Sequence, residues 1–326
     1  MKKNSIFKTH NISDFEKLSL DIFRFQATHN LVYNQYLNLL NIDVEAIQKI
    51  NKIPFLPIQF FKSHKIFSSR EKHQKIFLSS GTTGSIQSKH FVSDLSIYEE
   101  SFTKGFEYFY GDIKEYTVLA LLPSYLERDG SSLIYMVADL IQKSKKPKSG
   151  FYLHNLEELG ENLRILDEKS EKVLLIGVSF ALLDLVESYN FKLKNTIVME
   201  TGGMKGRRKE LIREELHEIL TKGFGVPSIH SEYGMTELLS QAYSKGNGIF
   251  ECPPWMKILT RDPEDALTIL PEGKSGGINV IDLANFNSCS FIATQDLGKT
   301  FADGTFEVLG RFDNSDIRGC NLLVLK

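Results

Sequence analysis

Short apolar runs alternate with stretches of helical periodicity through the middle of the chain. The runs have the continuous apolar character of buried strands and lie at 75–78, 117–123, 172–177 and 195–200. The periodic stretches repeat apolar and aromatic residues at helical intervals and lie at 94–110, 131–141 and 179–189. Strands that alternate with helices predict an α/β fold with a mostly parallel sheet flanked by helices.

The two ends of the chain carry different patterns. Near the N-terminus, Ser13–Glu16 has the spacing of a capping box before apolar residues at helical intervals, so a helix is predicted there. A second helical stretch follows at 44–50, and the two prolines of 53–62 predict an extended, aromatic-rich connector. In the C-terminal part, Gly, Pro and Asn separate short β-prone runs. We therefore place an α/β region at 1–245 and a smaller β-rich subdomain at 246–326.

The composition restricts the classes of partner and compartment. Lys and Arg number 39 and Asp and Glu 41, so the net charge of -2 argues against nucleic acid or an anionic membrane as a general partner. Three cysteines without a Cys-x-x-Cys pair argue against a disulfide framework and a zinc site. The N-terminus lacks the apolar core of a signal peptide, and no apolar stretch reaches the about 18 residues of a membrane span. We therefore expect a cytoplasmic protein without a membrane span.

Hydroxyl side chains and glycines gather directly after the first apolar run. Glycines expose their backbone N–H groups, and hydroxyls add donors that suit phosphate oxygens. The cluster consists of Ser79, Ser80, Gly81, Thr82, Thr83 and Gly84. Its composition is typical of an anion-holding loop, and it fits an ordinary connecting loop as well.

A pair of glycines follows the run at 195–200. In parallel sheets ligands gather outside the carboxyl ends of strands, so these positions are candidates for ligand contact. The backbone of Gly202 and Gly203 has no side chain that would keep a purine away. A turn before the next helix explains the two glycines nearly as well.

The segment 231–237 is more specific for a nucleotide. Tyr233 supplies an aromatic ring that can stack on adenine, and Gly234 follows it. Thr236 supplies a hydroxyl for phosphate, and Glu237 supplies a carboxylate for Mg²⁺. The segment therefore predicts an adenine nucleotide with a magnesium ion beside it.

Four motifs resemble, in their order along the chain, those of the acyl-adenylate-forming ligases, the superfamily of the acyl-CoA synthetases and the peptide-synthetase adenylation domains. They lie at 79–84, 233–237, 293–298 and 310–319. The resemblance implies the fold of the large N-terminal domain of these ligases, with ATP and Mg²⁺ as cofactors. It assigns Thr83 and Glu237 to the charge that develops on phosphate. It also implies that Asp296 accepts hydrogen bonds from the ribose hydroxyls, that Arg311 contacts ribose or phosphate, and that Asp313 occupies the hinge.

The chain also departs from the pattern of this superfamily. Ile86 and Gln87 stand where the phosphate loop usually carries proline and lysine, which makes Lys89 the candidate for a lysine contact to phosphate. The sequence ends at Lys326, shortly after the hinge motif. We therefore expect the swinging C-terminal domain of the superfamily, with its catalytic lysine, to be absent.

One branch of the superfamily, the acyl-protein synthetases, resembles this chain over nearly its whole length. The segments that carry the likeness lie at 53–57, 124–128 and 318–323. The branch includes the long-chain-fatty-acid–luciferin-component ligase, which activates a fatty acid as its adenylate and passes the acyl group to its own cysteine. The resemblance places that nucleophile at Cys320, where Arg318 would favour the thiolate. A buried strand cysteine is the alternative reading of Cys320.

Two other functions stay open. The chain is alternatively a ligase that donates the acyl group to an external thiol, on CoA or an acyl-carrier protein, or a non-catalytic nucleotide-binding relic of the fold. The partners expected in the first two cases are a carboxylic acid and an acyl-accepting or reductase protein. Dependence of ATP–pyrophosphate exchange on a carboxylic acid separates both enzymes from the relic.

Overall fold

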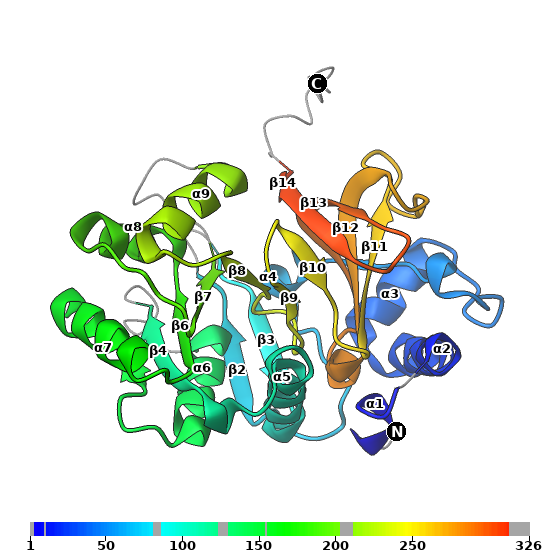
Figure 1. The fold of residues 1–326 in the computed structure, drawn as a ribbon. Coiled ribbons are helices and arrows are strands. Elements are labelled where there is room, and N and C mark those ends of the chain that lie inside the picture. Colours follow the sequence, from blue (N-terminus) through cyan, green and yellow to red (C-terminus); the bar gives the residue numbers. More distant parts are fainter. Residues whose placement is uncertain are drawn as a thin grey trace.

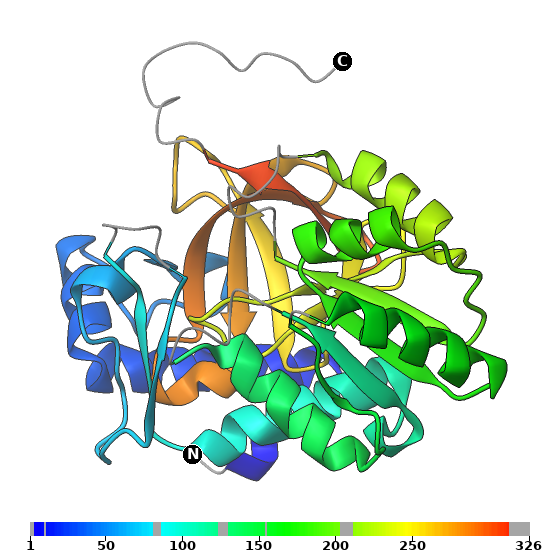
Figure 2. The ribbon, with the colours of Figure 1, turned by 90° about the vertical axis from the view of Figure 1, so that its left-hand side faces the viewer.

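The computed structural model describes residues 3–9, 11–80, 86–122, 130–153, 155–202 and 211–312. One half of its large sheet is parallel and follows the apolar runs of the sequence. Its strands are β4 (Thr117–Leu121), β5 (Gly150–Phe151), β6 (Val173–Gly177), β7 (Thr196–Thr201) and β8 (His230–Tyr233). The accompanying helices are α5 (Leu95–Tyr110), α6 (Ser132–Ser144), α7 (Leu156–Glu168), α8 (Ser179–Ser188) and α9 (Arg213–Phe224). Every residue of β4 and β6 is buried because helices cover both sides of these strands (Figures 1 and 2).

The other half of the sheet is antiparallel and joins the first half at β8. Its strands are β9 (Ala242–Ser244), β10 (Ile249–Glu251), β11 (Met256–Arg261), β12 (Ser275–Asp282), β13 (Phe291–Thr300) and β14 (Phe306–Arg311). The order across the whole sheet is β11-β12-β13-β14-β10-β9-β8-β7-β6-β4-β5. A short strand, β1 (Leu56–Pro57), pairs in parallel with β13. The proposed division at 245/246 stays a prediction, and the pairing changes from parallel to antiparallel between β8 and β9.

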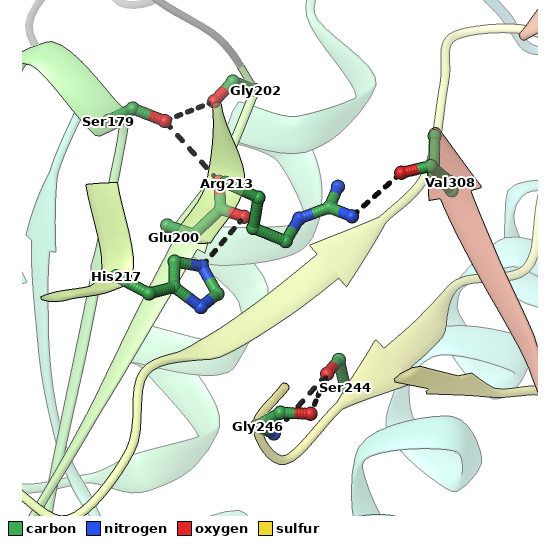
Figure 3. A network of polar contacts seen from close by, with 8 residues as sticks. All are labelled: Ser179, Glu200, Gly202, Arg213, His217, Ser244, Gly246 and Val308. Carbon is green, nitrogen blue, oxygen red and sulfur yellow. Dashed lines mark hydrogen bonds and ion pairs between the residues drawn. The ribbon is translucent and has the colours of Figure 1, made fainter. Parts of the chain in front are cut away.

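The N-terminal part of the chain packs beside the antiparallel half. It contains α1 (Lys3–Ile6), α2 (Ile12–His29), α3 (Leu31–Leu39), a short 3₁₀ helix at Ile50–Lys52 and α4 (Phe60–Ser63). Two further 3₁₀ helices lie later in the chain, at Ile113–Glu115 and Leu283–Asn287. A separate antiparallel pair, β2 (Lys75–Leu78) and β3 (Lys89–Val92), lies on either side of residues 79–88 in the sequence and is cyan in Figure 2. A link between the halves comes from Arg213, whose Nη1 donates to the carbonyl of Val308 at 2.9 Å (Figure 3).

The fold class predicted from the sequence is confirmed, whereas several N-terminal details are wrong. The cap of α2 is Asn11 and not Ser13, because the side chain of Asn11 accepts a hydrogen bond from Asp14 N at 2.9 Å. The second helix lies at Leu31–Leu39, whereas 44–50 holds a turn at 44–46 and no α-helix. The connector at 53–62 contains β1 and the start of α4.

No helix in these ranges is both long enough and apolar enough to cross a membrane.

Candidate active site

A cavity of about 320 Å³ lies between the parallel and the antiparallel halves of the sheet. Its walls come from the carboxyl ends of β2, β7 and β8, from the first turns of α6, and from β13 and β14. Open α/β sheets bind their ligands at this position. The predicted residues that line the cavity are Ser79, Ser80, Gly202, Gly234, Thr236, Glu237, Asp296 and Arg311.

Other predicted residues are not in this wall. Lys89 is exposed on β3, and the cavity lining within the described ranges does not include it. Some predicted positions lie outside the described residues, so their roles stay predictions. They are Gly81, Thr82, Thr83, Gly84, Gly203, Asp313 and Cys320.

Tyr233 lies beside the cavity. Its ring packs against Phe250 and Phe306, with centroid distances of 6.0 and 5.6 Å. Its hydroxyl donates to Asp296 Oδ2 at 2.8 Å. Burial, followed by the charge of Asp296, raises the pKa of this hydroxyl well above its usual range, so the group remains a donor. In this geometry Tyr233 orients Asp296, and stacking of its ring on adenine stays a prediction.

Asp296 is held from two sides and is 8% exposed. Tyr233 binds one carboxylate oxygen of Asp296, and Arg311 Nε donates to the other, Oδ1, at 3.1 Å. The side chain of Arg311 is 79% exposed. An ionised carboxylate has about four positions for hydrogen-bond donors. Asp296 therefore keeps acceptor capacity for ribose hydroxyls while its orientation is fixed.

Buried side chains fix the backbone of the motif at 236–237. His90 Nδ1 lies 2.8 Å from the carbonyl oxygen of Thr236. Burial lowers the pKa of His90 to about 4, so the ring is neutral at pH 7 and Nδ1 carries the hydrogen that it donates. Asn285 Nδ2 donates to the carbonyl of Glu237 at 2.7 Å. These bonds leave the side chains of Thr236 and Glu237 directed to the cavity that they line.

Asp282 fixes the continuation of this segment. It is fully buried and accepts hydrogen bonds from the backbone N–H groups of Leu239 and Ser240 at 2.8 and 3.0 Å. The hydroxyl of Ser240 donates to the same carboxylate at 2.6 Å. The backbone that leads to Gln241 is therefore rigidly tied to the end of β12.

Glu237 is a buried carboxylate beside two cations. Burial raises the pKa of its carboxyl, against opposing effects of a hydrogen bond from Ser88 and of the charges of Lys62 and Arg311. The described residues contain no group of three or more His, Cys, Asp or Glu side chains that would hold a metal ion. Mg²⁺ commonly uses one or two carboxylates together with substrate phosphates, so a single carboxylate fits a magnesium ion that arrives with ATP.

A third carboxylate, that of Glu232, lines the cavity on the opposite side of β8. Consecutive residues of a strand point to opposite faces, so Glu232 leaves β8 away from Tyr233. Across the β7–β8 pair, Thr201 Oγ1 donates to Glu232 Oε2 at 2.5 Å. Gln241, from the loop after the motif, and Tyr98, from α5, line the same cavity.

On the far side of β7, another polar network supports Gly202 (Figure 3). The hydroxyl of Ser179 lies 2.7 Å from the carbonyl oxygen of Gly202 and 3.3 Å from Glu200 Oε2. Nε2 of His217 lies 3.7 Å from Glu200 Oε1. The network fixes the carbonyl of Gly202 at the edge of the cavity, and Gly202 is one of the two glycines predicted to contact the purine.

Sequence reasoning missed several residues of this wall: Lys62, Ser88, Glu232 and Gln241. It also missed His90, which positions the motif from a neighbouring strand. Only Glu232 carried a readable signal, because it directly precedes Tyr233 in a strand that ends at the predicted site. The other four come from segments whose place in the wall depends on the tertiary fold.

Two cysteines of the described residues are poor nucleophiles. Burial raises the pKa of the Cys289 thiol to about 12, and it raises the pKa of the Cys252 thiol even further above the usual range. The thiolate is the nucleophilic form, so neither residue is suited to accept an acyl group.

No protein-family model matches the chain, and no curated protein matches it. Solved structures do. The ATP-bound MatB from Rhodopseudomonas palustris has a TM-score of 0.55 and 18% identity, covering 72% of this chain and 47% of its own. The long-chain-fatty-acid-CoA ligase FadD1 from Archaeoglobus fulgidus has a TM-score of 0.52 and 16% identity, covering 72% and 51%. The chain thus spans about half the length of these two proteins.

A third structure matches more of the chain. The 2-hydroxyisobutyryl-CoA ligase in the postadenylation state, in complex with R3-HIB-AMP, has a TM-score of 0.69 and 10% identity. The match covers 93% of this chain and 68% of that protein. The chain therefore has the fold of the N-terminal domain of adenylate-forming ligases.

Proposed function

We propose that the chain activates a carboxylic acid with ATP, forming an acyl-adenylate and pyrophosphate. The observation that carries the proposal is the convergence of three distant motifs on one cavity, through Ser79 and Ser80, Thr236 and Glu237, and Asp296. The likeness to ligases solved with ATP and with R3-HIB-AMP supports the same reaction. The whole cycle remains a proposal, because that likeness concerns the fold.

The proposed roles divide the cavity. The hydroxyls and backbone N–H groups of 79–84 hold the triphosphate, and Asp296 accepts hydrogen bonds from the ribose. Gly202 lies against the base, on the support of Ser179. Arg311 adds a positive charge at the ribose and phosphate end.

In the chemical step an oxygen of the substrate carboxylate attacks the α-phosphorus of ATP. The new carboxylate–phosphorus bond forms as the bond from that phosphorus to the bridging oxygen breaks, and pyrophosphate leaves with the bonding electrons. The chain contributes orientation of the two reactants and donors for the charge on the phosphate oxygens. Thr83, Thr236 and Lys62 are the proposed donors closest to that charge.

Glu237 would hold the magnesium ion, which supplies charge neutralisation on the phosphates when bound. His90 and Asn285 position Glu237 through the backbone on either side of its side chain. A change at either residue would therefore act on adenylation without touching the nucleotide.

In a second step a thiolate attacks the carbonyl carbon of the adenylate, and AMP leaves as the thioester forms. We propose Cys320 as the acceptor, on the resemblance to the acyl-protein synthetases and on the raised thiol pKa of both Cys252 and Cys289. The same resemblance suggests a fatty acid as the substrate. Transfer to CoA or to an acyl-carrier protein is the competing route.

Pyrophosphate release with a panel of carboxylic acids tests the first step. Thr83→Ala and Glu237→Ala should each lower acid-dependent release by about 100-fold, because each removes a group that acts on transition-state charge. Glu161→Gln, on the exposed face of α7, is the control and should behave as the native chain does. Unchanged release in either alanine variant would remove that residue from the site.

Intact-protein mass spectrometry tests the second step. With ATP, Mg²⁺ and an acid that supports pyrophosphate release, the native chain should gain one acyl group that neutral hydroxylamine removes. Cys320→Ser should release pyrophosphate in the first half-reaction and gain no acyl group. Rapid acyl-CoA formation without an adduct on the native chain would move the acceptor to an external thiol.

A further inference from the structure

The cavity wall opposite Asp296 carries two acceptor groups, the carboxylate of Glu232 and the amide oxygen of Gln241, for which the described residues supply no cationic partner. We call its residues Tyr98, Thr201, Glu232, Gly234 and Gln241 the Glu232 subsite; all five line the cavity. The inference drawn from this subsite rests on the proposed adenylation and concerns the class of acid.

The Glu232 subsite lies apart from the ribose end. Tyr233 donates to Asp296, so the carboxylate of Asp296 lies on the Tyr233 side of β8. Glu232 leaves the strand on the other side, where Thr201 of β7 donates to it. A nucleotide whose ribose meets Asp296 therefore leaves the Glu232 subsite to the second reactant.

Glu232 is a half-buried carboxylate at the cavity wall, without a cationic partner in the described ranges. Burial raises the pKa of its carboxyl to about 7; the hydrogen bond from Thr201 opposes this shift, and the nearby charge of Glu200 adds to it. Removal of a carboxylate from water is unfavourable unless an opposite charge or donors replace the water. Only Oε2 receives a hydrogen bond from a described residue, through Thr201.

Gln241 is an independent second observation. The residue is 5% exposed, and its Oε1 is buried with no hydrogen-bond partner among the described residues. Its Cγ lies beside Gly234, where an added Cβ would come within 3.3 Å, and the same Cβ would come within 2.2 Å of Glu232 Oε1. Gly234 therefore brings the two acceptors together at one patch of the wall.

We infer that the acid carries a protonated amine, which binds between the carboxylate of Glu232 and Oε1 of Gln241 while its carboxylate faces the α-phosphate. Such an amine supplies the positive charge that no described residue gives to Glu232 and the donor that none gives to Oε1 of Gln241. The substrate class is then an amino acid of modest size.

A fatty acid fits this wall poorly. Its methylene groups would cover the oxygens of Glu232 and Gln241 without offering a donor, and each buried acceptor left unpaired is unfavourable. Ile58, Leu133 and Met136 also line the cavity and would contact the carbon skeleton of an amino acid. The inferred class therefore replaces the fatty acid that the resemblance suggests.

The test compares acids that differ only by an amine in place of a methyl group. Suitable pairs are glycine with propionate, alanine with isobutyrate, β-alanine with butyrate and 4-aminobutyrate with pentanoate, with hexadecanoate as the fatty arm. Pyrophosphate release measures kcat/KM, and calorimetry in the presence of AMP measures binding of the acid without turnover. The proteins are the full native chain, Glu232→Gln, Gln241→Leu and the control Glu161→Gln.

The native chain should prefer the amine member of at least one pair by about 10-fold to 100-fold, as expected for a hydrogen-bonded charge pair. Glu232→Gln and Gln241→Leu should each reduce that preference by about 10-fold and leave ATP binding unchanged, whereas Glu161→Gln should keep the preference. If the native chain binds the amine-bearing acids, Glu232→Gln abolishes this binding and no acid causes pyrophosphate release, the result would support the Glu232 subsite and refute adenylation. Release with propionate, butyrate or hexadecanoate that neither variant alters would support adenylation and overturn the amine. Absence of both binding and release would overturn both.

Discussion

Replacement of Glu232 by Gln should stabilise the ligand-free chain at alkaline pH. The pKa of the Glu232 carboxyl is raised from 4.5 to about 7, mainly by burial, so the folded chain favours the protonated form. Among the described residues, the titratable groups whose charges interact with it are Glu200 on β7, Tyr98 on α5 and Tyr243 on β9, and none of these three supplies a positive charge. The stability that the raised pKa provides is complete below about pH 4.5 and is lost as the pH rises through about 7.

The size of the effect follows from this shift. Each unit of pKa corresponds to about 1.4 kcal/mol, so the native chain should lose about 2 to 3 kcal/mol of unfolding free energy between pH 5 and pH 8 through Glu232. Gln does not titrate and keeps an oxygen for the Thr201 hydroxyl. With an unfolding entropy of about 2 cal/mol/K per residue, the chain of 326 residues gains or loses about 0.7 kcal/mol per degree. The variant should therefore melt about 3 to 4 °C higher, relative to the native chain, at pH 8 than at pH 5.

Thermal melting of the native chain, Glu232→Gln and the exposed control Glu161→Gln at both pH values measures this difference. All melts should use one scan rate and no ligand, because bound ligands shift the melting temperature. The control should follow the native chain at both pH values. A constant difference between Glu232→Gln and the native chain from pH 5 to pH 8 would refute the raised pKa of the Glu232 carboxyl.

Three further substitutions test other parts of the site. Gly234→Ala places a Cβ 2.2 Å from Glu232 Oε1, so the Glu232 carboxylate must move by about 1 Å or more. Because the acid would then be misplaced, kcat/KM for the acid should fall by about 100-fold while the affinity for ATP stays the same. Full activity of this variant would contradict the close approach of Gly234 and Glu232. Lys62→Met should lower the rate of pyrophosphate release by about 10-fold or more because Lys62 lines the cavity, whereas Lys89→Met should change that rate by no more than about threefold. A larger loss of rate in Lys89→Met than in Lys62→Met would restore Lys89 as the phosphate ligand. Asp296→Asn should raise the KM for ATP by about 10-fold and the KM for the acid much less, and unaltered ATP binding by calorimetry would remove Asp296 from the ribose site.

The amino-acid pattern was sufficient to predict the parallel half of the sheet and the meeting of several motif residues at one cavity, whose function stays a prediction. The strands at 117–121, 173–177 and 196–201 are continuous apolar runs, and a buried parallel strand leaves that signature directly in the sequence. The positions at the carboxyl ends of such strands follow from topology, which is why Thr236 and Glu237 could be placed beside Ser79 and Ser80.

The parts that could not be predicted depend on packing between distant segments. Lys62 reaches the cavity because α4 follows β1, which pairs with a strand more than 200 residues later in the chain. His90 and Asn285 act through backbone carbonyls, and no pattern in their own segments indicates this. Tyr233 shows a related limit, because the sequence gives its ring but not the aromatic neighbours that surround it.

The central claim is that this cavity joins a carboxylic acid to AMP. ATP–pyrophosphate exchange tests it most directly, because label from pyrophosphate enters ATP only if the adenylate forms reversibly on the protein. With Mg²⁺ and the amine-bearing acids, the native chain should exchange label at a rate that depends on the acid, and Glu237→Ala should lower that rate by about 100-fold. Exchange that is absent with every acid, in a chain that still binds ATP, would contradict the account and leave a nucleotide-binding protein without adenylating activity.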